Sequence, residues 1–234
     1  MSEFKVEKYA DFGTSDPWVA RIMMGLPRLV NAVPAFASRR DAFQTVLGET
    51  HEALGMAFND LREIQRLVQD ENVPALDRTK AYENLYGHLW QAYKDRFQKL
   101  MRALGYDIGF LFQKDAIFEK GAAEFLEQHP KLADLVEMMR RDRADFQKRL
   151  GEYRNDYLEH RKDFDPKLVE ALHRPDVAEA MFDNVWQAIE DNVALLVQSL
   201  LPPQFQLSEI PEAERDPGAP ERFQFAMTKL PAAE

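Results

Sequence analysis

The stretch YRNDYLEHR, residues 153–161, holds the side chains best suited to chemistry. His160 can exchange a proton near neutral pH, and Arg154 is a permanent cation whose planar fork suits anions. Five residues separate the two, and Asn155 directly follows the arginine. The stretch is therefore either a catalytic pair or only the charged end of a helix, where arginine and histidine favour the macrodipole.

Helical geometry limits how these two side chains can cooperate. On a regular helix His160 continues the apolar seam of Tyr153 and Tyr157, and Arg154 lies on its flank. Arg154 and His160 would then be about 120° apart around the axis and about 9 Å apart along it. One regular helix cannot easily bring both to one atom, but a frayed helix end or a second subunit with facing copies would let both line one groove.

An arginine followed at once by a polar residue and then, after a short interval, by a histidine near a helix end resembles the motif of the HEPN superfamily (higher eukaryotes and prokaryotes nucleotide-binding domains). The matching residues are Arg154, Asn155 and His160, and the resemblance covers about residues 36–200. It implies an all-α bundle, a homodimer whose two motifs face one cleft, and a metal-independent endoribonuclease. Some members of the superfamily have lost activity and serve as binding modules.

The resemblance also implies a role for each residue. RNA carries its own nucleophile, the 2′-hydroxyl, so the protein would need no serine, cysteine or metal. His160 would act as general acid or base, Arg154 would hold the scissile phosphate, and Asn155 would position the phosphate or orient the histidine. The alternative is a non-catalytic helical module that binds a protein or a nucleotide. The acidic Asp156 and Glu159 inside the motif favour that alternative.

Composition excludes several classes of protein. The net charge of −10 argues against non-specific DNA binding, although residues 131–162 carry nine basic and seven acidic residues and would attract RNA locally. No apolar run approaches the roughly 20 residues of a membrane span. The first residues lack the layout of a signal peptide, so we expect a cytoplasmic protein.

No cofactor or metal site is expected from the sequence. The chain has no cysteine, which excludes disulfides and thiolate zinc sites. A di-iron bundle needs two Glu-x-x-His pairs, and the chain has one such spacing, Glu170 to His173. The ten glycines are scattered and form no phosphate-binding loop.

Prolines outline the elements that must position the motif, because proline is costly inside a helix. The thirteen prolines leave long gaps at 35–73, 75–129, 131–165 and 176–201, all with helical periodicity. Gly105 is placed to end one helix, and Asp107 to cap the next. We therefore predict an all-α, up-and-down bundle of about five long helices over residues 35–202.

The two ends of the chain are predicted to be extended arms, residues 1–34 and the proline-rich residues 203–234. Two short pieces in them, Phe4–Val6 and Arg222–Met227, alternate in the manner of strands. They would permit a small terminal β-pair.

Overall fold

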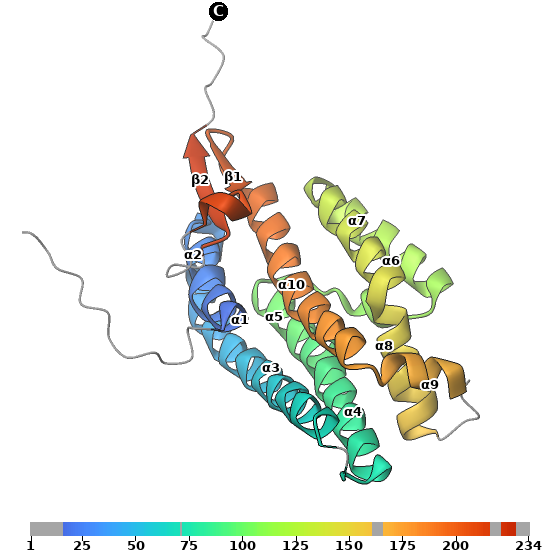
Figure 1. Cartoon of the computed structure of the whole chain (residues 1–234). Coiled ribbons are helices and arrows are strands. Elements are labelled where there is room, and N and C mark those ends of the chain that lie inside the picture. The colour runs from blue at the N-terminus through green and yellow to red at the C-terminus, as the bar shows by residue number, and fades with distance from the viewer. Residues whose placement is uncertain (1–15, 71, 161–165, 216–220, 228–234) are drawn as a thin grey trace, which may run out of the picture.

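The computed structural model describes residues 16–70, 72–160, 166–215 and 221–227. Its long helices alternate in direction, which confirms the predicted all-α, up-and-down bundle (Figure 1). The first is α3 (Arg40–Val68), preceded by a 3₁₀ turn at Pro34–Arg39. The second comprises α4 (Ala75–Trp90), a π-helical stretch (Gln91–Phe97) and α5 (Gln98–Ala103). The last is α10 (Pro175–Leu200), which lies between α3 and the α7–α8 side of the bundle.

The helix that carries residues 153–160, here called the motif helix, spans residues 133–159. It comprises α7 (Ala133–Asp142), a π-helical stretch (Arg143–Gln147), α8 (Lys148–Glu152) and a second π-helical stretch (Tyr153–Glu159). A 3₁₀ turn at Pro130–Leu132 leads into it. The short helix α9 (Pro166–Leu172) follows it in sequence and packs on α10.

The connection between α5 and the motif helix is built from short elements. A 3₁₀ turn (Gly109–Phe112) precedes α6 (Asp115–Gln128). Oδ1 of Asp107 accepts a hydrogen bond of 3.0 Å from the backbone N–H of Gly109. The predicted cap at Asp107 therefore serves the 3₁₀ turn, and the α-helix begins several residues later.

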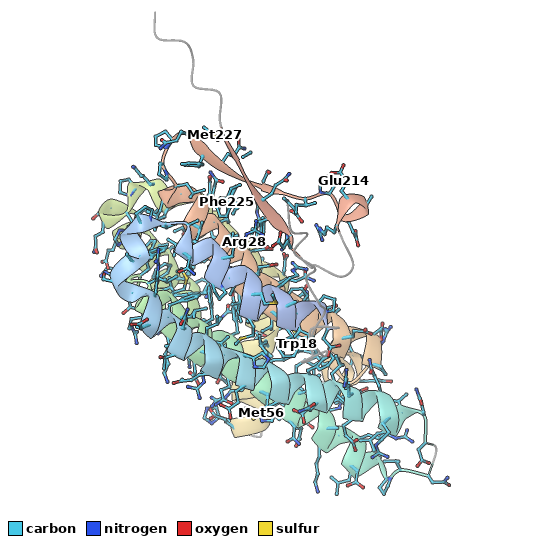
Figure 2. All side chains as sticks on the ribbon, turned by 90° about the vertical axis from the view of Figure 1, so that its left-hand side faces the viewer. Trp18, Arg28, Met56, Glu214, Phe225 and Met227 are labelled. Atoms are coloured by element: carbon cyan, nitrogen blue, oxygen red, sulfur yellow. The ribbon has the colours of Figure 1, made fainter. Side chains whose placement is uncertain are left out.

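The N-terminal segment differs from its prediction. Residues 17–31 were predicted as part of an extended arm, but they form α1 (Pro17–Ala20), a π-helical stretch (Arg21–Gly25) and α2 (Leu26–Asn31). This helix packs on α3 and α10, and Trp18 lies on its buried side (Figure 2). The prediction was wrong here because both prolines are tolerated: Pro17 stands in the first turn of α1, and Pro27 stands in the first turn of α2, just after the widened π turn.

The C-terminal segment forms a small antiparallel hairpin of β1 (Phe205–Glu209) and β2 (Phe223–Met227). Phe205 pairs with Met227 and Glu209 with Phe223, and the 3₁₀ turn Glu212–Glu214 lies between the strands. The strand predicted near residues 222–227 is confirmed, with residues 205–209 as its partner. Phe4–Val6 lies outside the described residues. The hairpin stands at the end of the bundle, near Arg28 of α2 (Figure 2).

A buried polar cluster lies in the core around Asp142. The carboxylate of Asp142 accepts hydrogen bonds from the Tyr93 hydroxyl (3.1 Å) and from Nδ2 of Asn192 (2.7 Å), all to the same oxygen. Burial raises the pKa of Asp142 to about 6, although both hydrogen bonds oppose the shift. None of the described helices has the length and hydropathy needed to cross a bilayer.

Gly105 ends α5 as predicted, with a φ of 96°, and a Cβ there would collide with the Arg39 guanidinium. We expect Gly105→Ala to lower the free energy of unfolding by more than about 1 kcal/mol, because alanine disfavours positive φ. Gly48→Ala is the matched control, since Gly48 is exposed in α3 with no other atom near its Cβ position. It should gain up to about 1 kcal/mol. Urea unfolding measures both, and equal effects would contradict the role of the backbone angle.

Candidate functional site

The end of the motif helix is wound more widely than an α-helix. Residues Tyr153–Glu159 are π-helical, and the backbone N–H of His160 donates to the carbonyl of Asn155 at 3.1 Å. In such a turn residues five apart become neighbours, in place of those three or four apart. The predicted positions of Arg154 and His160 assumed a regular α-helix, so the observed winding changes which side chains meet.

This winding brings Arg154 together with Glu159. Nη1 of Arg154 donates to Oδ1 of Asn155 at 3.0 Å and lies 2.6 Å from Oε2 of Glu159, five residues further on. The Arg154 side chain keeps 32% of its surface exposed. Arg154 is therefore held by its own helix, and a bound anion would compete with Glu159 for the guanidinium.

His160 terminates the helix and is exposed to solvent. Within the described residues, its imidazole makes no hydrogen bond or ion pair with Arg154, Asn155 or any other side chain. His160 thus follows the Arg154–Asn155 pair on the same helix and is hydrogen-bonded to Asn155 through the backbone, but its imidazole contacts neither side chain.

The motif helix is anchored beside these residues by a cluster of aromatic side chains. Tyr153 is fully buried, its ring packs on Tyr86 of α4, and its hydroxyl lies 2.6 Å from Nε2 of His173. Burial lowers the pKa of His173, so its neutral ring can accept the hydrogen bond. Tyr82 stacks on the same imidazole with centroids 4.8 Å apart. From the sequence His173 was a candidate metal ligand only, and its contacts are those of a structural residue.

A groove with a volume of about 430 Å³ runs along the motif helix and reaches Asn155 and Asp156. Its floor includes Gln147, Gly151 and Asn155, which recur every four residues and so share one helix face. Neither Arg154 nor His160 is among its lining residues. The remaining lining residues come from α4, the start of α6 with the segment before it, and the motif helix: Trp90, Phe112, Gln113, Lys114, Asp115, Arg143, Lys148 and Glu152.

This groove was not predicted from the sequence. The four-residue spacing of Gln147, Gly151 and Asn155 can be read from the sequence. The spacing does not show which residue of the neighbouring helix packs opposite them, so it does not predict a groove. That facing residue is Trp90, whose Cη2 lies 2.9 Å from the position that a Cβ on Gly151 would take.

No group of histidine, aspartate and glutamate side chains in the described part of the chain is arranged to hold a metal ion. Comparison with known proteins adds no relative: the chain matches no family model, no curated protein and no solved structure. The site is therefore interpreted from its own residues.

Proposed function

We propose that the chain is a HEPN-like helical protein that cleaves RNA without a metal ion, as a homodimer, with Arg154, Asn155 and His160 as the catalytic residues. The observation that supports it most strongly is an exposed His160 at the end of the helix that carries the hydrogen-bonded Arg154–Asn155 pair. All three residues stand at the end of one long helix in an all-α bundle, the setting in which the motif is expected.

The chemistry assigned to these residues is a transfer within the RNA chain. The 2′-oxygen attacks the neighbouring phosphorus, and the bond from phosphorus to the 5′-oxygen breaks. The 2′-hydroxyl loses a proton to one imidazole, and the leaving 5′-oxygen takes a proton from a second. The two copies of His160 in a homodimer would supply both groups, and the products are a 2′,3′-cyclic phosphate and a 5′-hydroxyl.

Arg154 would stabilise the negative charge that grows on the phosphate oxygens during this transfer. Its hydrogen bond to Oδ1 of Asn155 orients the guanidinium before substrate binds. The phosphate must replace the carboxylate of Glu159, and the two anions present the same fork-shaped pattern to arginine. Glu159 would then act as an internal substitute for the phosphate in the free protein.

The ion pair between Arg154 and Glu159 also favours a second function, a helical module that binds a protein or a nucleotide without catalysis. In that case Arg154 and Glu159 neutralise each other and serve only to stabilise the helix end. The two functions differ in whether the exposed imidazole of His160 is needed for any activity toward RNA.

The test is incubation of the purified protein with total RNA in EDTA, beside the Arg154→Ala/His160→Ala double variant. We expect the wild type to leave 2′,3′-cyclic phosphate ends and the double variant to cleave at least about 10²-fold more slowly. Arg66→Ala is the matched control, because Arg66 also pairs with a glutamate on its own helix, Glu63, at an exposed position. Equal RNA integrity in the wild type and the double variant would contradict catalysis and favour the binding module.

A further inference from the structure

We propose that the groove beside Asn155 binds one base of a single-stranded RNA, and that Gln147 favours a base with an exocyclic amino group. The choice of RNA as ligand depends on the proposed function. The aromatic walls of the groove and its unpaired polar group are observed independently of Arg154 and His160, neither of which lines it.

The size and walls of the groove suit a flat heteroaromatic ring. Its volume of about 430 Å³ lies in the range of small-molecule sites. Trp90 and Phe112 line it with their rings edge to face, at 6.1 Å between centroids. Aromatic side chains of this kind provide surfaces on which bases stack, whatever the base.

Gln147 supplies the selective element. It is 4% exposed, and its Oε1 is buried without a hydrogen-bond partner. An unpaired buried acceptor is unfavourable, and the terminal torsion of glutamine is soft, so a small rotation can turn the amide toward a ligand in the groove. An acceptor there pairs with the amino group of adenine, cytosine or guanine, whereas uracil has no amino group to offer.

The position of the groove connects it with the motif. Gln147 and Asn155 stand on the same face of one helix, separated by Gly151, whose missing side chain leaves room for Trp90. A base seated over Gln147 would place its own phosphate toward Asn155 and Arg154. Lys114 and Lys148 also line the groove and can attract the RNA backbone, although Lys148 is paired with Asp115 at 2.9 Å.

The test measures binding separately from cleavage. Labelled 2′-O-methyl oligonucleotides of adenosine, cytidine or uridine, which cannot be cleaved, are titrated with the full-length protein by fluorescence anisotropy. We expect the adenosine and cytidine oligomers to bind about five- to tenfold more tightly than the uridine oligomer, as one added hydrogen bond predicts. Gln147→Leu should abolish that preference and leave the fold intact, because it removes an unpaired buried acceptor.

Gln44→Leu is the matched control, since Gln44 is exposed on α3, which contributes no lining residue to the groove. Gln147→Met, an unbranched replacement, serves if the leucine variant does not fold. No binding, equal affinity for the three oligomers, or a preference that survives in the Gln147 variants would overturn the inference.

The outcomes for the two proposals can be told apart. If cleavage depends on His160 but no base preference depends on Gln147, the groove inference is contradicted and the proposed ribonuclease function stands. If the base preference depends on Gln147 but the protein does not cleave RNA, the ribonuclease proposal is contradicted and the groove inference stands.

Discussion

Replacing Glu190 by alanine is expected to lower the free energy of unfolding by about 3–5 kcal/mol, the usual loss when one member of a buried ion pair is removed. Glu190 is 2% exposed. Its carboxylate accepts hydrogen bonds from Nε of Arg21 at 2.9 and 3.0 Å, and from Nη1 of Arg222 at 2.9 Å. It therefore joins the N-terminal helix, α10 and the hairpin at one buried point.

Arg21 is the residue that loses its ion-pair partner in that variant. Arg222 keeps its contacts with Asp191 and Glu209, whereas the only carboxylate that pairs with Arg21 among the described residues is Glu190. The guanidinium of Arg21 also lies 4.3 Å from the centroid of the Trp186 ring, and its side chain is 12% exposed. A cation held there without a counter-ion is costly.

Urea unfolding followed by circular dichroism measures this effect. Glu63→Ala is the control, because Glu63 pairs with Arg66 at an exposed position, and it should leave the unfolding midpoint unchanged. A loss of less than about 1 kcal/mol in Glu190→Ala would show that the ion pair is as weak as a surface pair.

The second large effect is a pH dependence caused by Asp142. Its pKa is about 6 in the folded chain against an ordinary value of 3.8. Because the folded state holds the proton more tightly, this group favours folding more as pH falls from about 6 toward 4, and it opposes folding above pH 6. One pKa unit is about 1.4 kcal/mol, so the two values correspond to a cost of about 3 kcal/mol at neutral pH.

Asp142→Asn should remove most of that cost. Tyr93 and Asn192 both donate to the same oxygen of Asp142, and the amide oxygen of an asparagine can accept both bonds. We expect the variant to be more stable than the wild type by about 1–3 kcal/mol at pH 7.5, and the difference to become small at pH 4. Urea unfolding of both proteins across this range is the measurement. A variant less stable than the wild type at pH 7.5 would show that the charge strengthens the two hydrogen bonds by more than its burial costs.

The bundle itself was predictable because its determinants are local. Proline removes a backbone donor and fixes φ, so the gap between Pro175 and Pro202 outlined α10. Glycine adopts a positive φ without strain, so Gly105 marked the end of α5. The apolar spacing of three and four residues fixed which face of each helix is buried, and Tyr153 is buried as its position in the seam required.

The candidate site was predictable as a list of residues but not as an arrangement. The sequence alone determined that Arg154, Asn155 and His160 stand near the end of one helix, because helical periodicity and the break before Pro166 place that end. The tertiary structure decided the winding of the last turn, in which Arg154 meets Glu159 and Asn155. It also decided that residues 17–31 are helical and that Trp90 faces Gly151. In each case the deciding factor is how another segment packs against the residue, and packing between distant segments is not encoded in the spacing along a single helix.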